Sequence, residues 1–376
     1  MVNRRLQFGG GTDLNERHFH VGHLLLTVMT IIQRHLGMQC FMRYLFLLLI
    51  VLTSSCSDDG APLELTGKTM GTTYRILIAG PAKSSSLTET HEQIERKLIQ
   101  INALMSTYDS ESEISRFNRT RPGAPFSLHA DTAEVLAFSL ALADKTGGAF
   151  DPTIGPLVEL WGFGRATSTD QAPRDDRIQV VKQQIGYQSL QLDTDAPTVK
   201  TPIGRQLDFS ATAKGFAVDA LAAILVQQGY SNFLVEIGGE LFSKGEKRPG
   251  QPWRVAIEMP GNATRAIYRA FPLIDSAIAT SGDYRNYFES NGQRFSHTID
   301  PRTGYPITHA TTSVTVVAST TLEADGWATA LNVLGPVAGM QLAADQNLAV
   351  VMLVFEKNEL KALESAAFKD YLAQSL

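Results

Sequence analysis

The sequence predicts an α+β fold, and three features support that class. Four segments carry apolar residues at helical spacing, and six others have the β-branched and apolar composition of strands. Neighbouring strand segments are joined by short turns, which favour antiparallel pairing over a doubly wound parallel sheet. No Pro/Ser-rich linker divides the chain. We therefore expect one large interleaved domain with mixed or antiparallel sheets, flanking helices and a central cleft.

The amino terminus indicates export. Residues 44–52 form an apolar run too short to span a bilayer, preceded by Arg43 and followed by small residues that end at Cys56. This layout resembles a bacterial lipoprotein signal. We expect residues 42–56 to be the signal peptide, Cys56 to be lipidated and residues 57–64 to be a linker. Thr53 departs from the aliphatic residue usual at its position, and an uncleaved hydrophobic anchor is the alternative.

Residues 1–41 form a basic segment longer than usual before a signal core, so Met38 or Met42 would make a better start. Two interpretations are open. The segment is either a non-native or unstructured extension, or an amphipathic helix built on apolar residues such as Leu24, Val28 and Ile31.

The sequence predicts helices at residues 87–105, 131–145, 212–228 and 325–334. Apolar residues recur every three or four positions in the first of them. Asp131 is a suitable N-cap for the second, which Gly147 ends, and Gly229 and Gly335 end the other two.

The sequence predicts strands at residues 73–78, 233–237, 253–258, 276–280, 311–318 and 348–355. In residues 239–260, Gly245 and residues 249–252 mark a hairpin loop. The polar residues 165–177 indicate a surface loop.

Composition excludes several function classes. The net charge of −5 argues against nucleic-acid binding by bulk charge. Both cysteines, Cys40 and Cys56, precede the body, which therefore has no disulfide, thiolate zinc site or cysteine nucleophile. The motifs G-x-G-x-x-G after a strand, P-loop, H-E-x-x-H and G-x-S-x-G are absent. Catalysis must use oxygen, nitrogen or a bound ion.

Three segments contain residues suited to a flat ring. Met70 could lie on an aromatic ring while Gly71 allows close backbone approach, and Tyr108 could stack on a base. Asp151, beside Phe150, could hydrogen-bond a planar heterocycle. Structural alternatives remain open for the first two segments: an ordinary strand start at Met70 and a core-capping tyrosine.

Three further segments suit phosphate or an ion. Lys214 follows small residues at a predicted helix start, and such a start is a natural phosphate site. The alternative is structural: a helix packed closely on a sheet also requires small residues. His297 lies in a turn with Asp300, where a lone histidine is usually structural. Asp325 and Thr329 share a helix face, and their oxygens suit Mg²⁺. An N-cap role for Asp325 is the alternative.

Together and in this order, these segments resemble the ApbE family, the FAD:protein FMN transferases once called thiamine-biosynthesis lipoproteins. The resemblance covers about residues 65–350 and rests on these motifs: MGTTY, MSTYDSESEISRFN, GGAFDPTIGPLVELWGFG, DFSATAKGFAVD, SGDYRNYF, HTIDPRTGYP and DGWATALNVLG. It implies an ApbE-like, T-fold-related domain over residues 65–376.

The resemblance implies that Mg²⁺-dependent cleavage of FAD releases AMP and attaches FMN through a phosphoester to a threonine, or sometimes a serine, of a partner. Implied acceptors are subunits of membrane redox complexes, the Na⁺-translocating quinone reductase (Nqr) and Rnf types. We expect a lipid anchor on the periplasmic side of the inner membrane, while Ser57 after the cysteine leaves the outer membrane open.

The resemblance also implies the site residues. The flavin and the rest of FAD would contact Met70, Tyr108, Ala149, Phe150, Asp151, Asp208, Lys214 and Ile299. The Ala211 carbonyl, Asp325 and Thr329 would hold the magnesium ion. The acceptor hydroxyl needs a base or metal activation, and His297 is the candidate base.

Three other functions fit parts of this pattern. A Mg²⁺-dependent FAD pyrophosphatase would use the same motifs and release free FMN and AMP. A periplasmic FAD-binding lipoprotein would have no need of Asp325 and Thr329. A flavin-dependent redox enzyme would retain its flavin rather than consume FAD.

Overall fold

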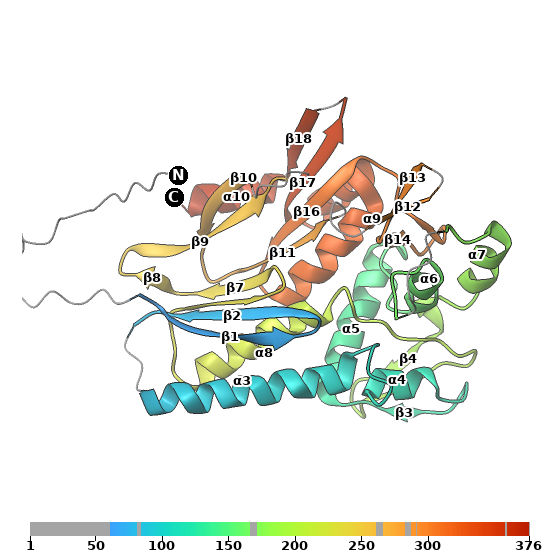
Figure 1. Ribbon diagram of the computed structural model, residues 1–376, viewed down its shortest axis with the longest axis horizontal. Helices are drawn as coiled ribbons and strands as arrows, with labels where there is room; N and C mark the ends of the chain where they lie inside the picture. Colours follow the sequence, from blue (N-terminus) through green and yellow to red (C-terminus); the bar gives the residue numbers. More distant parts are fainter. Residues whose placement is uncertain are drawn as a thin grey trace, which may run out of the picture. The chain divides into compact units, whose positions relative to one another are not determined.

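The computed structural model describes residues 61–80, 84–165, 171–260, 266–282, 287–290, 292–357 and 359–375 (Figure 1). The predicted signal peptide, Cys56 and the extension 1–41 lie outside these residues. Residues 61–376 group into one unit by their contacts. No helix in the described ranges is long and apolar enough to cross a membrane.

An eight-stranded antiparallel sheet is the centre of the fold, which confirms the α+β class. Its strands, in spatial order, are β1 Leu63–Thr69, β2 Thr72–Ile78, β6 Phe233–Ile237, β7 Glu240–Lys244, β11 Ala277–Gly282, β16 Thr311–Ala318, β17 Ala349–Glu356 and β18 Glu359–Glu364. β1 includes the last two residues of the expected linker, because Leu63 and Glu64 pair with β2.

The predicted strand at residues 253–258 lies outside this sheet. It is β9, Gln251–Glu258, in a separate sheet with β8, Glu246–Arg248, and β10, Ile267–Leu273. The predicted hairpin loop is too long, because residues 251–252 already belong to β9. β7 pairs with β6 and β11 rather than with β9. The remaining strands form small sheets: β3 Phe126–Ser127, β4 Gln191–Asp193, β5 Thr198–Lys200, β12 Tyr287–Ser290, β13 Gln293–Ser296, β14 Ile299–Asp300 and β15 Tyr305–Pro306.

Helices and strands cover the two faces of the main sheet (Figure 1). On one face, α9 packs on β11 and β16, α8 packs on β6 and β7, and α3 packs on α8. On the other face, β9, β10 and α10 enclose a separate core cluster. Alternation along β16 places Val316 in the core under α9 and Val317 in that second cluster.

All four predicted helices are present. The helices are α3 Ser84–Met105, α4 Glu113–Asn118, α5 Ala130–Lys145, α6 Gly155–Leu160, α7 Asp175–Lys182, α8 Ala213–Gln227, α9 Thr321–Asp345 and α10 Ala366–Gln374, with a 3-10 turn at Tyr187–Ser189. The predicted surface loop ends early, because α7 begins at Asp175, and its residues 166–170 lie outside the described ranges.

Helix starts differ from the prediction. α3 begins three residues earlier than predicted, at Ser84. The starts of α5 and α9 differ in their capping residues. The N-cap of α5 is His129, whose side chain accepts a hydrogen bond from the Asp131 amide, so Asp131 lies in the first turn. α9 begins at Thr321 with Thr320 as its N-cap. Asp325 therefore lies inside the helix, and its alternative role as an N-cap is wrong.

The predicted end of α9 is a break rather than a stop. Gly335 has φ 74° and ψ −173°, a left-handed conformation that interrupts the helix before Pro336. A second helical stretch then continues to Asp345.

Candidate active site

A cavity of about 400 Å³ opens where α8 and α9 meet the end of β11. Ten of the twelve predicted site residues line it: Ala149, Phe150, Asp151, Asp208, Ala211, Lys214, His297, Ile299, Asp325 and Thr329. They come from segments up to 180 residues apart in the chain, from Ala149 to Thr329. The fold thus collects motifs that composition and spacing alone could not connect.

Asp325, on α9, is buried, with 5% of its surface exposed. Its Oδ2 accepts a hydrogen bond of 3.0 Å from the Gly215 amide at the start of α8. Its Oδ1 lies 3.6 Å from Lys214 Nζ, and that ammonium lies 2.6 Å from Glu240 Oε1. One ammonium therefore stands between two carboxylates in the wall of the cavity.

Burial and mutual charge shift the pKa values of this triad. Burial raises the pKa of the Asp325 carboxyl, although Lys214 and the Gly215 amide oppose the shift. Burial likewise raises the pKa of Glu240 to about 7, against the opposing effect of Lys214. Burial lowers the pKa of the Lys214 ammonium, but attraction to Asp325 and Glu240 outweighs it and the net shift is upward.

Gly215 allows α8 and α9 to cross closely. A Cβ atom at this position would overlap the carbonyl oxygen of Thr321 and lie 2.8 Å from Asp325 Cβ. Asp219, one turn further along α8, accepts hydrogen bonds from the Thr321 and Leu322 amides at 2.8 and 2.9 Å. Each helix thus supplies a carboxylate to the amino-terminal amides of the other. The start of α8 was expected to bind phosphate, but its Gly215 amide donates to Asp325 in this structure.

The predicted magnesium ligands share the cavity. Asp325 and Thr329 lie four residues apart on α9, and Ala211 faces the same space. A carboxylate, a hydroxyl and a carbonyl fit Mg²⁺, which binds few protein oxygens and keeps several waters or phosphate oxygens. Among the described residues, no three His, Cys, Asp or Glu side chains gather closely enough to hold a metal ion. Ala211, Asp325 and Thr329 would leave the other positions around a six-coordinate ion to further ligands.

Hydrogen bonds from Thr153 and Tyr187 fix the Asp151 carboxylate. Its Oδ1 accepts hydrogen bonds from the Thr153 amide and hydroxyl at 2.8 and 2.6 Å, and its Oδ2 accepts one from the Tyr187 amide at 3.2 Å. Burial raises the pKa of Asp151, and these hydrogen bonds oppose the shift. Asp208 lies nearby, since its amide donates to the Pro152 carbonyl at 2.8 Å. Its Oδ1 accepts a hydrogen bond from the Ser210 amide at 2.8 Å, so hydrogen bonds orient both carboxylates at the cavity.

A second cavity of about 740 Å³ adjoins the first. The two share Val158, Asp208, Ser210 and His297, so His297 faces both spaces. Tyr108 lines the second cavity and is 68% exposed, which shows that it does not cap the core. The His297 ring lies edge-on to Phe163, with 6.2 Å between ring centroids.

Met70 lines neither of these cavities. Met70 and Gly71 form the turn between β1 and β2, with φ values of 48° and 72°. No protein atom lies within 4 Å of a Cβ built at Gly71, so its positive φ serves the turn, and the predicted close approach of a flat ring there stays a prediction. Met70 packs, partly buried, against the core, and its contact with flavin stays a prediction.

The sequence profile described as the ApbE family matches residues 70–352. The chain belongs to the ApbE family. It is 41% identical over 324 residues to a protein of Haemophilus influenzae named FAD:protein FMN transferase, covering 84% of this chain and 93% of that one. It is 40% identical over 326 residues to the Vibrio cholerae protein of the same name, covering 86% and 97%.

Solved structures of ApbE proteins share the fold. The flavin transferase ApbE from Vibrio cholerae has a TM-score of 0.76 at 39% identity, over 82% of this chain and 98% of that one. The apo flavinyl transferase ApbE of Pseudomonas stutzeri has a TM-score of 0.75 at 37% identity, over 83% and 96%. These matches support the ApbE-like fold expected from the motifs.

Two residues at or next to the first cavity were not predicted. Glu240 lines it beside Lys214. Asn332 does not line it, but its side chain donates to two lining residues, to Ser281 Oγ at 3.2 Å and to Thr298 Oγ1 at 3.4 Å. Spacing could have identified Asn332, which lies seven residues after Asp325 and so on the same helix face. Glu240 is an acid after Gly238 and Gly239, a weaker signal. Residues 283–286 of the SGDYRNYF motif lie outside the described residues.

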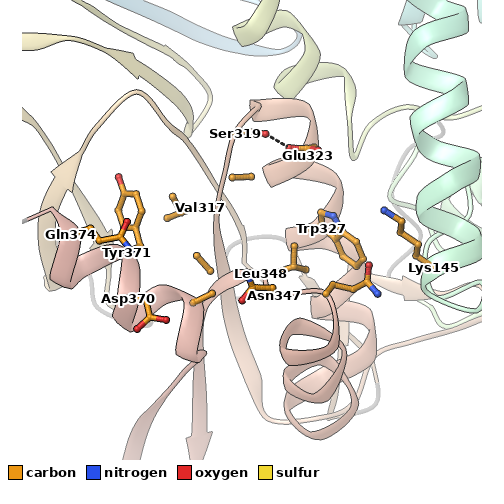
Figure 2. A pocket seen from close by; sticks show the side chains of 14 residues that line it. Lys145, Val317, Ser319, Glu323, Trp327, Asn347, Leu348, Asp370, Tyr371 and Gln374 are labelled. Carbon is orange, nitrogen blue, oxygen red and sulfur yellow. Dashed lines mark hydrogen bonds between the residues drawn. The ribbon is translucent and has the colours of Figure 1, made fainter.

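A third cavity, of about 550 Å³, contains none of the predicted site residues. Figure 2 shows the Trp327 ring beside Lys145 and a hydrogen bond between Ser319 and Glu323. The Lys145 ammonium lies 6.0 Å from the Trp327 ring centroid, and the Ser319 hydroxyl donates to Glu323 Oε2 at 2.6 Å. None of Lys214, Glu240 and Asp325 lines this third cavity.

Proposed function

We propose that this protein transfers FMN from FAD to a threonine or serine hydroxyl of a partner protein, with Mg²⁺, and releases AMP. As a member of the ApbE family it is a transferase that moves FMN from FAD to a protein. One observation carries the finer proposal. The cavity combines an all-oxygen ligand set with a lysine and a histidine, which suits cleavage of a pyrophosphate.

The reaction joins the acceptor hydroxyl oxygen to the phosphorus of the FMN half. The bond from that phosphorus to the bridging oxygen breaks, and AMP leaves with the bonding electrons. His297 faces both cavities, so we assign it as the base that takes the hydroxyl proton. Lys214 contributes positive charge beside the pyrophosphate.

Magnesium held by the Ala211 carbonyl, Asp325 and Thr329 would offset the charge that grows on the leaving phosphate. The burial of Asp325 strengthens its attraction to a cation because little water competes with it. The Gly215 amide fixes the carboxylate, so binding an ion requires little rearrangement.

The flavin would occupy the space near Tyr108, whose exposed ring offers a stacking surface in the second cavity. Phe150, Asp151 and Ile299 line the first cavity, where they would contact the flavin or the rest of FAD. The opening of His297 to both spaces would allow the reacting phosphate to lie between them.

The acceptors in this proposal are subunits of Nqr-type and Rnf-type redox complexes. The signal-like residues 42–56 and Cys56 support a lipid anchor on the periplasmic side of the inner membrane, and an outer-membrane anchor is the alternative. Such an anchor would keep the enzyme beside membrane-bound acceptors.

The test incubates the purified protein with FAD, Mg²⁺ and an Nqr-type acceptor domain. It measures covalent flavin fluorescence on a denaturing gel, together with AMP and free FMN. Fluorescent acceptor with an equal amount of AMP, lost in an acceptor Thr→Ala control, supports the transferase. Free FMN with AMP, regardless of acceptor, would favour the pyrophosphatase, and unchanged FAD would favour the carrier.

A further inference from the structure

We infer that Glu240 is a positioning residue that holds the Lys214 ammonium away from Asp325 and so keeps one Asp325 oxygen open to a cation. The inference rests on the proposed metal-dependent function and extends it to a residue that the sequence motifs did not single out. Its basis is the unequal sharing of one ammonium between two carboxylates.

The distances show which carboxylate holds the ammonium. Lys214 Nζ lies at hydrogen-bond distance from Glu240 Oε1, 2.6 Å, but 3.6 Å from Asp325 Oδ1. Asp325 Oδ2 is already occupied by the Gly215 amide. Oδ1 is therefore the Asp325 oxygen left for a cation, and it is also the oxygen nearest the ammonium.

The backbone fixes Glu240 in this role. Gly238 and Gly239 have φ values of 60° and 107° and turn the chain from β6 into β7, where Glu240 is the first residue. A Cβ at Gly238 would lie 3.5 Å from Lys214 Cδ. The lysine stem thus runs past the turn toward Glu240, with 27% of its side chain exposed.

Glu240 is a costly residue to bury for stability alone. It is 4% exposed, and its Oε2 has no hydrogen-bond partner among the described residues. A buried carboxylate with one unsatisfied oxygen is destabilising unless charge pairing compensates. Because Glu240 also lines the cavity, a role at the site explains its presence better than a role in packing.

Loss of the Glu240 charge would leave Asp325 as the nearest carboxylate to Lys214. The ammonium would then move onto Oδ1, since a buried charge pairs with the nearest opposite charge. A divalent cation would have to displace it. Glu240→Gln should therefore weaken cation binding in two ways. It removes one negative charge from the site, and it lets the Lys214 ammonium compete with the cation for Asp325 Oδ1.

A double-mutant cycle tests this with Mn²⁺ alone, followed by the electron paramagnetic resonance signal of free Mn²⁺. The proteins are wild type, Glu240→Gln, Lys214→Met and the double variant. We expect Glu240→Gln to raise the Kd for Mn²⁺ roughly tenfold when Lys214 is present. In the Lys214→Met background the same substitution should raise the Kd by a factor several times smaller. Glu240→Asp, with a shorter reach toward the ammonium, should be intermediate.

An equal loss in both backgrounds would overturn the inference, because Glu240 would then act through its own charge. No loss in Glu240→Gln would overturn it as well. Thermal unfolding of each variant separates a change in binding from a change in folding, and Glu240→Asp serves if Glu240→Gln does not fold. If wild type itself binds no Mn²⁺, the metal site of the proposed function fails, a result distinct from an additive cycle.

Discussion

The Gly215 amide donates a hydrogen bond to Asp325 Oδ2 at 3.0 Å and thereby joins the start of α8 to the second turn of α9. The helix that carries Lys214 and the helix that carries Asp325 are consequently fixed to each other at the site. An acid that is a candidate cation ligand is also an anchor between two helices.

Gly215→Ala should lower the free energy of unfolding by about 1–3 kcal/mol, because the new methyl group would overlap Thr321 and Asp325. The loss should occur even though alanine favours helices over glycine by about 1 kcal/mol. Urea unfolding measures it, with the exposed Ala223→Ser on the same helix as control. A variant as stable as wild type would show that α8 and α9 can separate without cost.

Asp325→Asn should reduce Mg²⁺-dependent FAD cleavage at least about 100-fold by removing the charge that would hold the ion. Its fold should persist, because the side-chain oxygen can still accept from Gly215 and the cost of burying a charge disappears. AMP release and thermal unfolding measure the two effects. Retained Mg²⁺-dependent activity would exclude Asp325 as a ligand.

Tyr108→Ala should weaken FAD binding by about 1–3 kcal/mol, the size of a lost stacking contact with an aromatic ring. Since Tyr108 is 68% exposed, the free energy of unfolding should change by no more than about 0.5 kcal/mol. Quenching of flavin fluorescence gives the affinity, and Tyr108→Phe, which keeps the ring, is the matched control. Equal affinity in all three proteins would remove Tyr108 from the flavin site.

Asp219→Asn tests the carboxylate that receives the amides of α9. Burial raises the pKa of Asp219 above its usual value, although the Leu322 and Thr321 amides oppose the shift. The folded protein therefore holds this proton to higher pH than the unfolded chain does. The contribution of Asp219 to the free energy of unfolding is consequently lost as pH rises from about 4 through the raised pKa. The asparagine variant should lack this decline.

Urea unfolding at a series of pH values between about 4 and 7 compares the two proteins. The stability of wild type relative to Asp219→Asn should fall with rising pH. The exposed Asp195→Asn serves as the control for a carboxylate outside the helix junction. A difference that rises with pH would mean that the hydrogen bonds outweigh burial.

Local patterns predicted much of this fold. The six predicted strands and four predicted helices exist because their apolar periodicity spans enough residues to specify a face. The two-residue strands β3, β14 and β15 contain too few residues to carry such a pattern. The start of α9 was misplaced because its amides are satisfied by Thr320 and by Asp219, which lies 102 residues away from Thr321.

The site was predictable where its chemistry is local. Asp325 and Thr329 are four residues apart, and helical spacing alone places them together. Glu240 escaped because its partner Lys214 lies 26 residues earlier, and their meeting depends on the turn at Gly238 and Gly239. The use of the Gly215 amide by a carboxylate 110 residues later was beyond any sequence window.

The long separation between Gly215 and Asp325 has a consequence for the order of folding. Loop closure between distant segments is entropically costly, and domains rich in such pairings fold slowly. A refolding intermediate that contains β1, β2, α3 and α8 but lacks docked α9 would have Lys214 without Asp325. With the ion held as proposed, cation binding should return only once α9 docks on α8, so bound Mn²⁺ would be a kinetic marker for that docking.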